Sequence, residues 1–184
     1  PARGSPVTTT RPTAAARNST PAPATPTTGV DSGPSARARE DPARAARSFP
    51  DRFLPCLDVV PRNGMEEIRR IKRYHDEFGL VAVTTFPAGC RTAINAAPYY
   101  PVYATCVELG LPIFITAGVP GPRVPMEPQK VEYLDEICWF FPKLKVVMRH
   151  GAEPWEALAV KLMLKWPNLY YSTSAFAPKH YPKA

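Results

Sequence analysis

Residues 141–155 read FPKLKVVMRHGAEPW, and this stretch decides the fold class. The apolar run at residues 145–149 predicts a buried strand. His150 and Gly151 follow it directly, and Pro154 suits the first turn of a helix, where a missing N–H leaves no hydrogen bond unmade. A strand, a short turn and a helix within so few residues indicate one unit of a parallel β-sheet protein.

The same alternation continues on both sides of this unit. Apolar runs predict strands at residues 53–60, 80–86, 111–116, 145–149 and 169–173. Helical periodicity fills the segments between them; Asn63 is expected to cap the first helix, and Gly79 to end it. Repeats of roughly 30 residues indicate βαβ units, and continuous apolar strands indicate burial on both faces of the sheet.

Two architectures stay open on this pattern alone, namely a doubly wound open sheet and part of a (β/α)-barrel. No GxGxxG or GxxxxGK[ST] motif follows any expected strand. Its absence disfavours a nucleotide-binding sheet.

The N-terminal segment differs in composition from the rest of the chain. All 19 aromatic residues lie after residue 48, and the preceding residues are rich in Pro, Ala, Thr and Arg. Such a segment cannot bury enough apolar surface to offset the entropy of ordering it. We therefore expect residues 1–50 to be a disordered tail and residues 51–184 to form the folded domain.

The charge and the cysteines indicate an ordinary cytoplasmic protein. The net charge is +7, of which the tail contributes +4, without a dense basic run, so nucleic acid ranks last among expected partners. The cysteines at 56, 90, 106 and 138 lie in or beside apolar runs and show no CxxC spacing, which predicts buried, reduced thiols. No apolar stretch approaches the length of a membrane span, and no secretory leader is visible.

The residues that could carry chemistry stand at the expected carboxyl ends of the strands, where sites of both architectures lie. His150 is placed near a helix start, where a neutral imidazole could bind a divalent metal. The alternative, favoured by spacing alone, is a hydrogen-bonded structural histidine. Asp58 could be a general base or a turn cap, and Arg123 could bind a carboxylate or be a solvated loop residue.

Several motifs together resemble the amidohydrolase-related family, in the branch of aminocarboxymuconate-semialdehyde-decarboxylase-like enzymes. They are ELGLP at 108–112, FPKLKVV at 141–147 with His150-Gly151 and Pro154-Trp155, and PNLYYS at 167–172. The resemblance covers nearly everything from residue 53 to residue 184. It implies a (β/α)-barrel rather than an open sheet.

The resemblance also implies a site with one divalent metal, usually Zn, at the barrel mouth. The family's strand-six histidine falls on His150, which is therefore expected to be catalytic and to bind the metal. Asp58 is expected to be a second catalytic residue because of its place at the end of a strand. Substrate contacts are expected from Arg123, Thr116 and Trp155. The family's His-x-His pair has no counterpart, Thr116-Ala117 fills the fifth-strand histidine position, and the eighth-strand aspartate would lie beyond residue 184.

We therefore expect a partial (β/α)8 TIM barrel, roughly strands 3 to 7 of eight. The leading hypothesis is a metal-dependent hydrolase or related decarboxylase, incomplete and inactive as this chain alone, for a small carboxyl- or carbonyl-containing substrate. The alternative is a non-catalytic remnant that forms a homo- or hetero-oligomer with a partner or a full-length paralogue through open sheet edges.

Overall fold

The computed structural model describes residues 45–175, 177 and 179. The tail predicted for residues 1–50 therefore lies almost entirely outside the described residues. Within them, residues 45–48 form a helical turn. This turn packs on the end of the first long helix, where the Arg47 guanidinium stands 4.5 Å from the Phe78 ring centroid.

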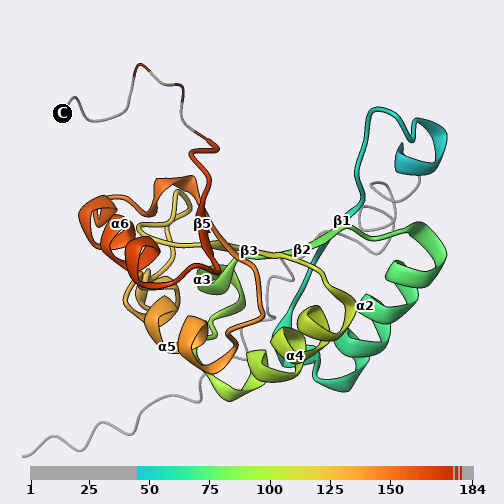
Figure 1. Ribbon diagram of the computed structural model, residues 1–184, viewed down its shortest axis with the longest axis horizontal. Coiled ribbons are helices and arrows are strands. Elements are labelled where there is room, and N and C mark those ends of the chain that lie inside the picture. The colour runs from blue at the N-terminus through green and yellow to red at the C-terminus, as the bar shows by residue number, and fades with distance from the viewer. Residues whose placement is uncertain (1–44, 176, 178, 180–184) are drawn as a thin grey trace, which may run out of the picture. The chain divides into compact units, whose positions relative to one another are not determined.

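Five parallel strands form one sheet, and their spatial order is their order in the chain (Figure 1). They are β1 (Cys56–Asp58), β2 (Ala82–Thr85), β3 (Ile113–Thr116), β4 (Val146–Arg149) and β5 (Leu169–Tyr171). Because every right-handed crossover steps in the same direction, all crossover helices cover the same face. A doubly wound sheet would reverse direction, so the predicted partial barrel is confirmed.

The longer helices occupy the predicted segments, whereas the short helix that follows β2 was not predicted. The helices are α2 (Met65–Phe78), α3 (Pro87–Cys90), α4 (Tyr100–Leu109), α5 (Tyr133–Phe140) and α6 (Glu156–Lys165), with 3-10 turns η1 (Pro61–Asn63), η2 (Ala97–Tyr99), η3 (Glu127–Gln129) and η4 (His150–Ala152). Gly79 ends α2 in the left-handed conformation, with φ 63°, as predicted. None of the helices in the described part of the chain is long and apolar enough to cross a membrane.

Two helix starts were predicted wrongly. Asn63 does not cap α2, because Gly64 holds the N-cap position and the Asn63 amide instead donates to Glu67 at 2.8 Å. Pro154 is not in the first turn of α6, which begins at Glu156. Positive φ angles at His150, Gly151 and Ala152 turn the chain before that helix can start.

The core lies between the sheet and the helices. Strand residues that face the helices are almost fully buried and join helix side chains in one cluster; they include Leu57, Val83, Ile113, Val146 and Leu169. The register places Asp58, Thr84, Phe114, Val147 and Tyr170 in one row on the opposite face. Asp58 and Tyr170 in this row are exposed. Burial on both faces was therefore predicted wrongly for the described residues, because no described element covers this row as the helices cover the other face.

The four cysteines also differ in burial. Cys106 and Cys138 are buried as predicted, and burial raises the pKa of each thiol to about 12. Cys56 is exposed because it lies on the face away from the helices, and Cys90 is half-buried. All four are free thiols, and the prediction of burial was wrong for Cys56.

One carboxylate joins the last two helices. Asp135 of α5 accepts hydrogen bonds from Lys165 Nζ and Trp166 Nε1, each at 2.7 Å. The bond from Lys165, followed by that from Trp166, lowers the pKa of Asp135. The contribution of this carboxylate to stability is therefore complete above the aspartate pKa of the unfolded chain and declines as pH falls through the folded value.

We predict that Asp135→Asn lowers the free energy of unfolding by about 0.5–1 kcal/mol at pH 7, a small loss because solvent screens the pair. The loss should shrink as the pH falls through the lowered pKa of Asp135, where the wild-type carboxyl takes up a proton. Urea unfolding at pH 7 and at a pH below that pKa measures this. Glu66→Gln, in a pair with side chains 72% and 77% exposed, is the matched control and should change little. An equal loss at both pH values would contradict the prediction.

Candidate functional site

A pocket of about 790 Å³ opens at the carboxyl ends of the strands. Every strand from β1 to β4 has a lining residue at or just after its last residue. The lining residues are Asp58, Phe86, Thr116, Val119, Pro120, Gly121, Pro122, Arg149, His150, Glu153, Pro154 and Ala175. The pocket thus lies where parallel α/β proteins carry their sites.

Arg149 crosses the uncovered face of the sheet at the pocket floor. It is the last residue of β4, and its Nη1 donates to Thr84 Oγ1 of β2, so the side chain spans the intervening strand β3. Its Nη2 lies 3.1 Å from His150 Nε2. A guanidinium has only donors, so Nε2 is the acceptor nitrogen of this imidazole.

The other nitrogen of His150 is also engaged. His150 Nδ1 lies 3.0 Å from the carbonyl oxygen of Ser174 and 3.2 Å from the Ser174 hydroxyl. Because the carbonyl can only accept, Nδ1 carries the proton. The imidazole therefore cannot take a proton from the Ser174 hydroxyl at that nitrogen, and the arrangement is not a nucleophilic serine–histidine pair.

The described residues do not fit a metal ion. They contain no group of three or more His, Cys, Asp or Glu side chains placed to hold one. His150, the one histidine at the strand ends that is described, presents its lone pair to a guanidinium. A catalytic zinc commonly has three protein ligands, so the predicted Zn ligand role of His150 has no support from its described neighbours.

Hydrogen bonds tie the loops around the pocket into one assembly. Gln129 is fully buried; its Oε1 accepts from the Ala88 N–H at 3.3 Å and its Nε2 donates to the Gly118 carbonyl at 2.9 Å. The Val119 N–H then donates to the Glu153 carbonyl at 2.8 Å. The loops after β2, β3 and β4 are thereby held together.

The structure brings together three of the residues predicted from the sequence. Asp58, Thr116 and His150 all line the pocket. Arg123 is exposed in the loop beyond the pocket lining, and Trp155 packs half-buried against the core. The catalytic and binding roles of all five residues stay predictions.

Sequence reasoning did not single out Arg149 or Glu153. Arg149 alternates with buried Met148 along β4, so a period-two reading would have placed it on the face away from the helices. Glu153 enters the pocket only because the chain turns sharply after His150. No local sequence signal predicts that turn.

The comparisons with known proteins agree with this geometry. A family model described as Amidohydrolase matches residues 1–184. No match was found among curated proteins. An uncharacterised TIM-barrel protein from Bordetella bronchiseptica is similar in structure, with a TM-score of 0.63 and 26% identity, over 73% of this chain and 48% of that one.

Two further solved structures share the fold. One is 4-oxalomesaconate hydratase from Rhodopseudomonas palustris, with a TM-score of 0.55 and 19% identity over 76% of this chain and 49% of that one. The other is manganese-bound 5-carboxyvanillate decarboxylase from Novosphingobium aromaticivorans, with a TM-score of 0.55 and 21% identity over 70% and 41%. The chain spans about half the length of these structures or less.

We predict that Gly118→Ala disrupts the pocket rim. Gly118 has φ +90°, and a Cβ there would stand 2.6 Å from the Glu153 carbonyl oxygen and 2.7 Å from the Ala152 carbonyl carbon. We expect a loss of about 2–4 kcal/mol in unfolding free energy, measured in urea. Gly121→Ala is the matched control from the same loop, where a Cβ meets nothing within 4 Å. Equal effects of the two substitutions would refute this account.

We predict that the 184-residue chain does not retain one zinc ion per chain after dialysis from micromolar Zn²⁺. The reason is that Arg149 holds the acceptor nitrogen of His150. Metal analysis by mass spectrometry measures the stoichiometry, with His150→Ala as the comparison. One zinc retained by the wild type and lost in His150→Ala would show that His150 is a ligand after all.

Proposed function

The chain belongs to the amidohydrolase family, and from that premise we propose that it forms part of a hydrolase or decarboxylase. The proposed substrate is a small molecule that carries a carboxyl or carbonyl group. The observation that carries the proposal is the convergence of Asp58, Arg149 and His150 on one pocket at the strand ends. Because the chain spans only part of its solved relatives, this activity is proposed for the protein as a whole.

Arg149 is the proposed substrate-binding group. Thr84 and His150 each take one guanidinium N–H, which fixes the plane of the group and leaves further donors for a ligand. Guanidinium groups bind carboxylates through paired hydrogen bonds, and such bonds are stronger than neutral ones. His150 acts in this proposal through Arg149, as the acceptor that orients it.

Asp58 and Glu153 are the proposed proton-transfer groups. Both line the pocket, and they come from different strand ends, β1 and the turn after β4. Carboxylates in such positions can remove or return a proton at a reacting atom. Asp58 thus keeps the catalytic role that the sequence predicts, and Glu153 is proposed as a second proton-transfer group.

Metal dependence characterises the family, and the similar decarboxylase holds manganese. Zinc is the metal that the sequence resemblance implies for the whole protein. Its remaining ligands would have to come from outside the described residues. We further propose that the protein is cytoplasmic and that neither a membrane nor nucleic acid is its partner.

A second proposal is an interaction role without catalysis. Among the described residues, β1 and β5 each pair with one strand only, so each has one edge that no described strand covers. A partner chain or a further copy could pair there. Sedimentation of the purified chain distinguishes the proposals: a stable oligomer that binds no carboxylate would favour the interaction role.

We predict that a small aromatic carboxylate such as benzoate binds in the pocket and that Arg149→Met weakens this binding by about 10- to 100-fold, the range for a lost hydrogen bond to a charged group. Calorimetric titration measures the dissociation constants, and release of CO₂ from hydroxybenzoates tests turnover. Arg69→Met, at an exposed arginine of α2 that does not line the pocket, is the matched control and should bind like the wild type. Absence of carboxylate binding by the wild type would count against the proposed function, and equal binding by Arg149→Met would remove Arg149 from it.

A further inference from the structure

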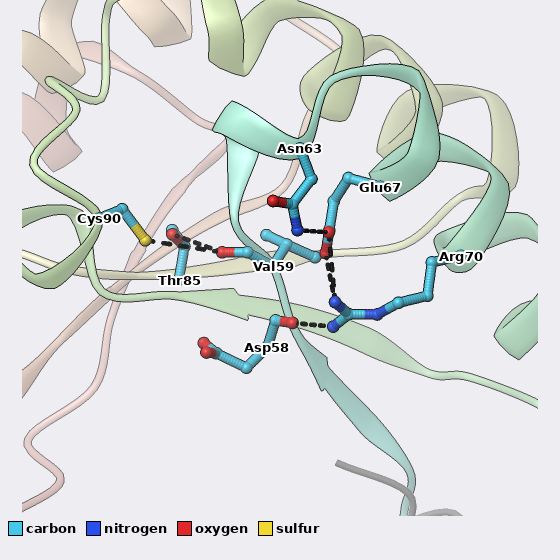
Figure 2. Close-up of polar contacts among 7 residues, drawn as sticks. All are labelled: Asp58, Val59, Asn63, Glu67, Arg70, Thr85 and Cys90. Carbon is cyan, nitrogen blue, oxygen red and sulfur yellow. Dashed lines mark hydrogen bonds and ion pairs between the residues drawn. The ribbon is translucent and has the colours of Figure 1, made fainter. Parts of the chain in front are cut away.

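A pair of opposite charges, a buried glutamate and a half-buried arginine, lies behind the end of strand β1. Glu67 of α2 is only 1% exposed, and its Oε1 lies 3.0 Å from Arg70 Nη1, one helical turn further on. The Asn63 amide donates to Glu67 Oε2 at 2.8 Å. Figure 2 shows these side chains gathered beside the last residues of β1.

The guanidinium of Arg70 reaches beyond Glu67 to the main chain. Its Nη2 donates to the backbone carbonyl of Asp58 (Figure 2). The Val59 N–H donates to Thr84 of β2 at 2.8 Å, so the backbone groups of Asp58 point to the opposite edge of β1. No described strand pairs at that edge, and Arg70 gives the Asp58 carbonyl its hydrogen bond there.

The next carbonyl along the chain is held from the other side. Thr85 Oγ1 donates to the Val59 carbonyl at 3.3 Å, and Cys90 Sγ stands 4.0 Å from the same oxygen. The Thr85 hydroxyl is itself 2.8 Å from the buried Tyr99 hydroxyl. Two consecutive peptide groups at the strand end are therefore fixed from opposite directions.

This fixation bears directly on the pocket. Asp58 carries the one carboxylate that β1 places in the pocket lining. In Figure 2 that carboxylate points away from Arg70, although the carbonyl of the same residue points toward it. With the peptide plane held, the direction of the Cα–Cβ bond is set as well.

Stability alone does not account for the buried pair. Removing two charges from water opposes folding, and apolar residues of similar volume are often as stable. The neighbouring pair Glu66 and Arg69 has the same spacing on the same helix, yet its side chains are 77% and 72% exposed, respectively. Two contacts separate this pair from its exposed counterpart: the Asn63 amide donates to Glu67, and Arg70 donates to the Asp58 carbonyl.

We propose that Arg70 is a positioning residue for Asp58, with Glu67 and Asn63 holding its guanidinium in place. Only a planar fork of several donors can bind the Glu67 carboxylate and the Asp58 carbonyl at once. The functional meaning of this inference rests on the proposed function, because it assumes that Asp58 belongs to the site. The geometry itself is testable without any substrate.

The experiment compares four chains: wild type, Arg70→Met, Arg69→Met and the double variant Glu67→Gln with Arg70→Met. Aspartate side chains are labelled with ¹³C, and the signal of the Asp58 carboxyl carbon is assigned by its absence from the NMR spectrum of Asp58→Asn. Two readouts are followed, the pH titration of the Asp58 carboxyl carbon and the hydrogen exchange of the Val59 amide. Thermal unfolding is recorded in parallel.

In Arg70→Met we expect the Asp58 titration curve to change and the Val59 amide to exchange at least 10-fold faster. Arg69→Met should match the wild type in both readouts. Arg70→Met alone also leaves the buried Glu67 carboxylate without its ion-pair partner, so this variant should have a lower melting temperature than the wild type. The double variant removes the Glu67 charge as well and should recover much of the lost melting temperature. The recovered double variant should still show the altered Asp58 signals.

A double variant with wild-type Asp58 titration and wild-type Val59 exchange would overturn the proposal, because the pair would then act on stability only. The result does not depend on the function. If the wild type binds no carboxylate but Arg70→Met alters Asp58, the proposed function fails and the positioning role stands. If carboxylate binds and Asp58 is unaltered, the reverse holds.

Discussion

The site depends on the one-directional winding of the sheet. Because the strands follow one another in space as they do in the chain, all crossover helices cover one face and the core forms there. The opposite face, where Thr84 lies beside Phe114 and Val147, has no described helix over it. Arg149 uses this freedom, since its side chain can lie across β3 to Thr84 only where no helix covers the sheet.

The sequence predicts the parts of this structure that depend on local periodicity. Apolar runs located all five strands, and Gly79 ended its helix where a left-handed residue was needed. The predictions that failed depend on what lies opposite a residue in space. Asn63 is a good cap by type, but the Glu67 carboxylate offers its amide a stronger acceptor. Cys56 sits in an apolar run, yet its strand position turns it to the open face.

The difference between local sequence patterns and contacts in space also explains why only part of the prediction for His150 was correct. Sequence reasoning placed His150 correctly at a strand end, in the pocket, but attributed its chemistry to a following helix that in fact begins six residues later, at Glu156. What decides its chemistry is the pair of groups on its ring nitrogens, Arg149 and Ser174, the second of which is 24 residues away. A motif match identifies which position of the family a residue occupies, but it does not show which groups hydrogen-bond to that residue. The family's metal role therefore cannot be carried to this ring from the motif alone.

Two buried polar side chains next to the pocket have the same structural role. Gln129 and Glu67 are both almost without solvent contact, and both lie on segments next to the site rather than in it. Each is bonded, directly or through Arg70, to main-chain groups of pocket segments: Gln129 to Ala88 and Gly118, and Glu67 to Asp58. Apolar side chains would fill the same volumes without desolvating polar atoms, but they have no donors or acceptors with which to fix a peptide plane. At these two positions the buried polar group holds the backbone of a pocket segment at a set angle, a requirement that comes from the pocket rather than from the core.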